Sequence, residues 1–193
     1  MKSLFKTLLS TGTAAALVLV AVTSPAFAAK PKWASKSDQS IVEFAVNASG
    51  GMVGDFDGNG EDFDILVYAL AVTGTIDVFN GDDYTVFAPN DQAFYDLTGK
   101  NTDEEALNAV LDLLTFEQVK AVLAYHVSEG VRNSRSVTRA KSVATLLEGN
   151  TISGRSGMIE ANFSTADLLD IDNRLQDGMV HVIDTVLLPL DPS

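Results

Sequence analysis

The 193-residue chain contains no cysteine, and beyond its first residues it has no apolar run long enough to cross a membrane. Without cysteine there is no disulfide framework and no thiol chemistry, so stability must come from packing. Basic residues are also scarce, because 13 lysines and arginines accompany 26 aspartates and glutamates. A surface this acidic repels nucleic acid and anionic lipid, so we expect no nucleic-acid partner.

Motifs that carry common enzyme chemistry are missing as well. The chain has no Gly-x-Ser-x-Gly, no His-Glu-x-x-His and no phosphate-binding loop. Its many carboxylates show no spacing that singles out a working pair. We therefore expect a non-enzymatic protein, and a small hydrolase is the least favoured class.

The first residues predict export. Lys2 and Lys6 precede the apolar run AAALVLVAV (14–22), and the AFA at 26–28 matches the small-x-small pattern that signal peptidase cuts. An uncleaved N-terminal anchor is the alternative. We favour a cleaved signal peptide (1–28), a secreted or periplasmic mature chain, and no membrane insertion after cleavage.

Helical signals dominate the first half of the remaining chain, and strand signals dominate the second half. The expected helices lie at 41–46, 62–74, 92–97, 106–114 and 116–126, with one further helical turn at 142–147. The expected strands lie at 84–88, 151–152, 158–163, 167–171 and 179–188. This order predicts an α+β fold with a mostly antiparallel sheet. No internal repeat is present, so we expect a linker (29–38) followed by a single domain (39–190).

Capping residues are expected to mark the helix ends. Asp62 is placed to cap the helix at 62–74, and Gly74 is placed to end it. Two capping boxes are predicted, Thr102 with Glu105 and Thr115 with Gln118.

Three segments, in this order, resemble the signatures of the fasciclin (FAS1) domain. They are YTVFAPNDQAFYDL (84–97), the Tyr-His segment VLAYHV (122–127) and DGMVHVIDTVLLP (177–189). The resemblance covers roughly 39–189 and implies the fasciclin wedge, a β-sheet sandwich with helices packed on one side. It also implies a secreted, single-domain protein of the bacterial type. The chain departs from the family pattern after the Tyr-His segment, at Asp177 and in the acidic stretch before the first long helix.

Asp91, His126, His181 and Asp184 fall within these signatures, and we interpret them as a structural motif. Either Asp91 or Asn90 caps the helix that follows Pro89. A long-range bond from Asp91 to His126 is a further hypothesis. A shared metal or catalytic pair is the alternative for the two histidines, but no cluster of further ligands accompanies them.

The same resemblance implies a binding surface. In animal members of the family, the segment around Tyr-His is implicated in integrin binding, which places Tyr125 and His126 near an adhesive face. Tyr125 as a core aromatic residue is the alternative, and we favour it. Arg132, Arg135 and Arg139, with Lys141 beside them, are either contacts for an acidic polysaccharide or a solvated loop.

The stretch DFDGNGEDFD (55–64) begins like a calcium loop of the EF-hand type. Its ligands would be Asp55, Asp57, Asn59 and Glu61. Position twelve of that loop is Leu66, where the motif requires a bidentate glutamate, and Leu66 belongs to the apolar face of a predicted helix. Asp62 or Asp64 could instead supply a carboxylate in a looser loop. We favour a polar turn, and any calcium bound here is expected to bind weakly.

These observations favour a secreted adhesion or binding module whose partner is an extracellular protein or a polysaccharide. It requires no cofactor. The alternative is a weakly calcium-modulated carbohydrate-binding protein of the periplasm or medium. Nothing in the sequence specifies an oligomeric state.

Overall fold

The computed structural model describes residues 36–76 and 83–190, so the predicted signal peptide and most of the predicted linker lie outside the described residues. The helices are α1 (Ile41–Ala48), α2 (Asp64–Thr73), α3 (Asp91–Thr98), α4 (Asp103–Leu113), α5 (Phe116–Tyr125) and α6 (Ser134–Val137). The strands are β1 (Tyr84–Pro89), β2 (Val127–Glu129), β3 (Val143–Ala144), β4 (Thr151–Arg155), β5 (Met158–Glu160), β6 (Thr165–Ala166), β7 (Leu168–Leu175) and β8 (Gly178–Ile183).

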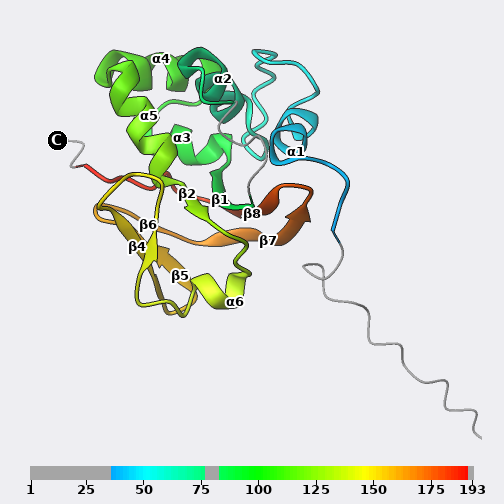
Figure 1. Cartoon of the computed structure of the whole chain (residues 1–193). Coiled ribbons are helices and arrows are strands. Elements are labelled where there is room, and N and C mark those ends of the chain that lie inside the picture. The colour runs from blue at the N-terminus through cyan, green and yellow to red at the C-terminus, as the bar shows by residue number, and fades with distance from the viewer. Residues whose placement is uncertain (1–35, 77–82, 191–193) are drawn as a thin grey trace, which may run out of the picture.

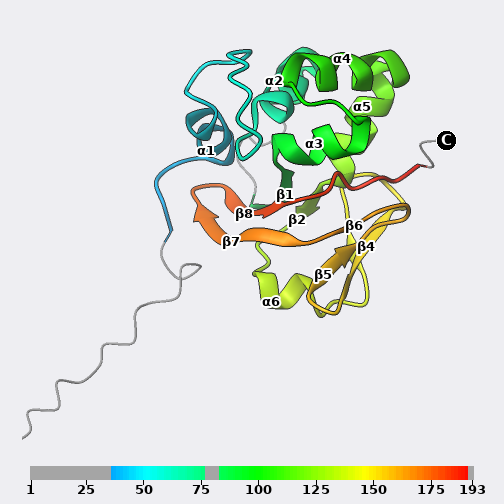
Figure 2. The same cartoon turned by 180° about the vertical axis from the view of Figure 1, so that it is seen from behind.

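The strands form two four-stranded sheets, one in the order β2-β1-β8-β7 and the other in the order β3-β4-β5-β6. Neighbouring strands run antiparallel, except that β1 and β8 are parallel. Helices α1 to α5 lie on one side of the first sheet, and the second sheet lies on its other side together with α6 (Figures 1 and 2). The predicted α+β class and the predominance of antiparallel pairing are confirmed.

The two central strands, β1 and β8, are buried along their whole length. Side chains of a strand alternate between the two faces of the sheet. Accordingly, Val86 and Val180 pack into the core on the helical side, whereas Phe87 and Ile183 pack into the core between the sheets. His181 shares the face of Phe87, and their rings stack with centroids 5.8 Å apart.

Short-range capping sets several helix starts. A capping box of Thr115 with Gln118 opens α5 as predicted, whereas at α4 the structure shows Thr102 accepting from the Glu105 N–H and no reciprocal bond. A capping box that the sequence reading missed, Ser40 with Glu43, opens α1.

Two local predictions were wrong. Asp62 does not cap α2, because Phe63 occupies the N-cap position and makes no side-chain cap. The segment 142–147 is not a helical turn: it contains β3, where Val143 pairs with Ile152 of β4. Gly74 ends α2 in the left-handed conformation, as predicted.

Candidate functional site

His126 ties the end of α5 to the segment that follows β8. Its Nε2 accepts a hydrogen bond from the Leu187 N–H (2.9 Å), which fixes the tautomer, so Nδ1–H donates to the Val122 carbonyl (2.7 Å). Burial lowers the pKa of His126 to about 4, and the hydrogen bond to Val122 offsets part of that effect. The imidazole is therefore neutral at physiological pH, and both of its nitrogens have partners within the protein.

Tyr125 is buried in the core between the sheets. Its hydroxyl donates to the Thr151 carbonyl (3.0 Å) and accepts from the Asn162 N–H (3.1 Å), and burial raises its pKa. Neither Tyr125 nor His126 presents its side chain at the surface. Their expected role as surface contacts is therefore wrong, and the alternative that we favoured for Tyr125, a core aromatic residue, is what the structure shows.

A network centred on His181 fixes the segment between β2 and β3. His181 Nδ1 accepts from the Asp172 N–H (3.2 Å), and Nε2–H donates to the Arg132 carbonyl (2.9 Å). The Asp172 carboxylate accepts from the backbone N–H (2.6 Å) and the hydroxyl (2.9 Å) of Ser134 at the start of α6. Asp172 adopts a left-handed conformation (φ 61°) in the irregular part of β7. The buried His181 is thereby joined through Asp172 to the start of α6.

Three cations project from this fixed segment, and we call Arg135, Arg139 and Lys141 the basic loop. All three are exposed, and none forms an ion pair with another described residue. Arg132 differs from them, because it is half-buried and its backbone N–H donates to the Thr85 hydroxyl (2.8 Å). The structure thus keeps Arg135 and Arg139 of the predicted binding residues at the surface.

Asp91 and Asp184 both have structural partners. The two carboxylate oxygens of Asp91 accept from the backbone N–H groups of Asp64 (2.9 Å) and Ile65 (3.0 Å), which open α2. The hypothesised bond from Asp91 to His126 is wrong, and Asn90, rather than Asp91, caps α3. Asp184 accepts from the Asp167 N–H (2.9 Å), joining the end of β8 to the start of β7.

The predicted calcium ligands do not converge. Asp55, Asn59 and Glu61 are exposed, and the Asp57 and Asn59 side chains accept from backbone N–H groups two residues further on, which makes successive Asx turns. Leu66, which occupies position twelve of the EF-hand register, is buried, as its place on the apolar face of the predicted helix led us to expect. Residues 55–61 thus form a polar turn that precedes α2, whereas Asp62 and Asp64 at the end of the stretch are buried.

The structure gathers a larger acidic group, in which two triads of carboxylates meet. Its members are Asp57, Asp62, Asp64, Asp91 and Asp103. The sequence offered Asp62 and Asp64 as ligands of a looser loop, but it did not predict that Asp91 and Asp103 join them. Burial is the main cause that raises the pKa of Asp91, and the neighbouring Asp62 adds to it; burial likewise raises the pKa of Asp64 to about 6. These residues come from separate segments, so only the density of aspartates around residues 55–64 signalled them in the sequence.

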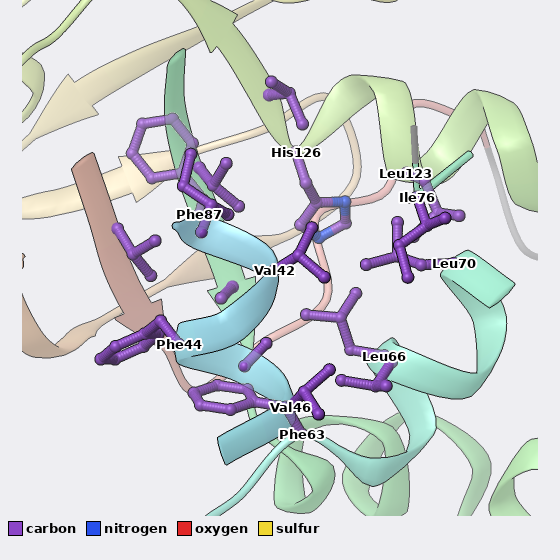
Figure 3. Close-up of a pocket in the computed structure, with 17 residues that line it drawn as sticks. Val42, Phe44, Val46, Phe63, Leu66, Leu70, Ile76, Phe87, Leu123 and His126 are labelled. Atoms are coloured by element: carbon purple, nitrogen blue, oxygen red, sulfur yellow. The ribbon is translucent and has the colours of Figure 1, made fainter. Parts of the chain in front are cut away.

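An apolar pocket lies beneath α1 and reaches His126 (Figure 3). Its volume is about 40 Å³, far below the roughly 300–1,000 Å³ of a small-molecule site. Val42, Leu66 and Leu123 line it, and His126, the titratable residue at its wall, already has both nitrogens bonded. We interpret the pocket as imperfect packing under α1.

A larger groove of about 330 Å³ lies between α3, α4, α5 and the segment after β8. Val110, Val122 and Leu188 are among its apolar lining residues, and the described lining includes no titratable group. Its polar members are used elsewhere, because Thr98 donates to the Phe94 carbonyl and the Gln118 side chain completes the cap of α5. The groove offers apolar contact and no group for acid–base chemistry.

Comparison with known proteins was made by family model and by sequence. The model of the Fasciclin domain matches residues 61–189. "Protein sll1483" of Synechocystis is 28% identical over 130 residues, which are 67% of this chain and 68% of that protein. "Immunogenic protein MPT70" of Mycobacterium tuberculosis is 31% identical over 59% of this chain and 54% of that protein. "Cell surface glycolipoprotein MPB83" of Mycobacterium bovis is 29% identical over 59% of this chain and 47% of that protein. The chain thus spans about half the length of the mycobacterial relatives.

Comparison of structures agrees with the family match. A FAS1 domain pair from the insect cell adhesion molecule fasciclin I superposes with a TM-score of 0.56 at 15% identity, covering 78% of this chain and 51% of that one. At this identity the likeness shows a shared fold. Among the described residues, none of the helices combines the length and the apolar character that a membrane span requires.

Proposed function

Because the chain belongs to the fasciclin domain family, we propose that it is an exported, non-enzymatic adhesion module that binds an acidic extracellular polysaccharide through the basic loop. The matched proteins support a surface role, since they include a cell-surface glycolipoprotein and a cell adhesion molecule. The sequence of residues 1–28 supports secretion or a periplasmic location, which is part of the same proposal.

The observation that carries the proposal is the exposure of three unpaired cations in an acidic protein. The whole chain has a formal net charge of −13, so most of its surface repels a polyanion. Arg135, Arg139 and Lys141 concentrate positive charge on α6 and the turn after it, and arginine forms bidentate hydrogen bonds with sulfate and carboxylate groups. A polyanion would therefore approach this molecule by one face.

The hydrogen bonds that hold α6 in place also favour binding of a polyanion by the basic loop. Asn133 caps α6 by accepting from the Ser136 N–H (2.8 Å), and Asp172 holds Ser134 from the neighbouring strand. Because α6 is held from both sides, less conformational entropy is lost when the arginines bind than in a free loop.

The test is binding of the purified protein to immobilised dextran sulfate, with unsulfated dextran as the neutral probe. We expect saturable binding to dextran sulfate that weakens as salt is added. The triple variant R135Q/R139Q/K141Q should bind at least tenfold more weakly. K36Q/K100Q/K120Q is the matched control, because it removes the same number of charges from described residues outside the basic loop. Equal losses in both variants would mean that net charge, and not the basic loop, governs binding.

Calcium modulation of the same binding is the second candidate, and the buried acidic group favours it. Each binding series is therefore run with millimolar calcium and again with chelator. Binding that disappears with chelator supports calcium modulation, whereas binding that is indifferent to calcium supports the basic loop acting alone. Absence of binding in both series contradicts both candidates.

A further inference from the structure

Five aspartates from four separate segments gather at the start of α2. The members are Asp57 and Asp62 in the loop before α2, Asp64 at its first turn, Asp91 at the start of α3 and Asp103 at the start of α4. They form two triads, Asp62-Asp64-Asp91 and Asp57-Asp64-Asp103, and in each triad one oxygen per residue lies within 4.8 Å of the others. Figure 1 shows α2, α3 and α4 on one side of the sheet β2-β1-β8-β7 and α6 on the other, so this group is separate from the basic loop.

The first triad is buried and incompletely satisfied. Asp62, Asp64 and Asp91 are 4%, 1% and 0% exposed. One oxygen of Asp62 and one of Asp64, Oδ1 in each case, are buried with no hydrogen-bond partner. No described lysine or arginine forms an ion pair with any of the five aspartates. Buried carboxylate oxygens normally have donors or a cation beside them, so these two oxygens point to a missing positive partner.

The donors that do reach this group fix its oxygens without neutralising them. Backbone N–H groups of Asp64 and Ile65 hold both oxygens of Asp91, and the Asn59 side chain donates to Asp62 Oδ2 (3.1 Å). Each carboxylate oxygen has a second lone pair, so these bonds leave capacity for coordination. The oxygens are thus positioned before any cation arrives.

We propose that Asp62, Asp64 and Asp91 bind a divalent cation of the calcium class. Calcium takes oxygen ligands at about 2.4 Å, so oxygens that share one ion lie no more than about 4.8 Å apart, as these do. Calcium also accepts irregular geometry and completes its shell with water or backbone oxygens, whereas magnesium requires a near-octahedral set. The bound ion would join α2 to α3 and fix the end of the loop that precedes α2.

The test is calorimetric titration of the chelator-treated full chain with calcium chloride, together with thermal unfolding in calcium and in chelator. We expect one calcium per chain, with a dissociation constant of about 10⁻³ M or tighter, as in extracellular calcium modules. Calcium at ten times that constant should raise Tm by several degrees. Asp62→Asn should weaken calcium binding at least tenfold, because a neutral amide replaces one of the three carboxylate ligands, and the Oδ1 of that ligand has no hydrogen-bond partner.

Asp55→Asn is the matched control, since it removes an exposed aspartate of the same acidic stretch and should leave affinity unchanged. In chelator, the Tm of Asp62→Asn should be no lower than that of the unaltered protein, because the substitution removes one of several repelling carboxylates. An unchanged or higher Tm in chelator shows that a loss of calcium affinity does not come from a loss of folding. Three results overturn the proposal: no saturable binding, full affinity in Asp62→Asn, or lost affinity in Asp55→Asn. Protein that ignores calcium and gains stability on acidification would show that shared protons, and not a cation, neutralise these oxygens.

Discussion

Protonation of His126 should destabilise the protein below neutral pH. Burial of the imidazole lowers its pKa from 6.5 to about 4 in the folded protein, whereas the unfolded chain keeps the ordinary value. The unfolded state therefore binds a proton more readily between these two values. The contribution of His126 to stability is complete above pH 6.5 and is lost progressively as the pH falls toward 4.

The magnitude follows from the size of this gap. Each pKa unit corresponds to about 1.4 kcal/mol, so full protonation removes about 3 kcal/mol of unfolding free energy. The local geometry also predicts that protonation destabilises the folded protein. A proton on Nε2 would face the Leu187 N–H, which now donates to this nitrogen at 2.9 Å. One of these two donors would then be left unpaired in the core.

The assay is urea unfolding followed by far-ultraviolet circular dichroism from pH 7.5 to 4.5, comparing the unaltered protein with His126→Gln. Glutamine retains a donor and an acceptor but does not titrate. At pH 7.5 the variant should be less stable by about 1–3 kcal/mol, the usual effect of disturbing buried hydrogen bonds. That difference should shrink by about 2 kcal/mol or more by pH 4.5.

Other titrating groups are present in both proteins and cancel in the difference. Asp64 and Asp91 have raised pKa values, so the stability they contribute is lost as the pH rises, opposite in sign to His126. Burial lowers the pKa of His181, which acts in the same direction as His126. A difference between protein and variant that stays constant from pH 7.5 to 4.5 would refute the assignment of the acid sensitivity to His126.

Three further substitutions, the first with a matched control, test the packing and a helix cap by urea unfolding. Gly178→Ala should lower the free energy of unfolding by about 3 kcal/mol or more, because the new Cβ would overlap the Tyr84 carbonyl across the β1–β8 pair. The control is Gly130→Ala, where the Cβ meets open space and only the positive φ is strained, so the loss should be about 1 kcal/mol. Equal losses in the two variants would contradict the clash. Tyr125→Phe should cost about 1–3 kcal/mol, since it strands a carbonyl and an N–H in the interior, and an unchanged midpoint would show that water replaces the hydroxyl. Thr115→Ala should cost about 1 kcal/mol through loss of the α5 cap, and a loss below the error of the measurement would mean that tertiary packing alone starts this helix.

Local signals predicted the helices well, because caps and apolar spacing act over a few residues. The Thr115 capping box and the stop at Gly74 both appear where the sequence placed them. Segment 142–147 was misread, since Val143 extends only because Ile152, nine residues further on, pairs with it. Strand β2 was missed for a similar reason: three residues carry no period of their own, and β1 supplies their partner.

The candidate sites were harder to predict, because exposure depends on how the layers stack. Tyr125 and His126 adjoin a loop in the sequence, yet one lies between the sheets and the other beneath the helices. The basic loop was visible as a run of cations, but its anchoring was not. That anchoring depends on His181, which lies 47 residues after Ser134, the α6 residue that it helps to hold through Asp172, so no local pattern records it.

The burial of α2 explains why carboxylates lie in the core at all. The predicted amphipathic stripe of this helix includes Leu66 and Leu70, but Ile65 and Ala69 are buried as well, so the first turn of α2 is buried on every side. The first N–H groups of a buried helix cannot reach water and need acceptors from the protein. Asp91 supplies them from α3, and the positive end of the helix dipole favours that charge. Asp62 and Asp64 lie beside Asp91 because they precede and open the helix whose first N–H groups Asp91 holds, and a bound cation would balance the charge of three carboxylates placed so close together.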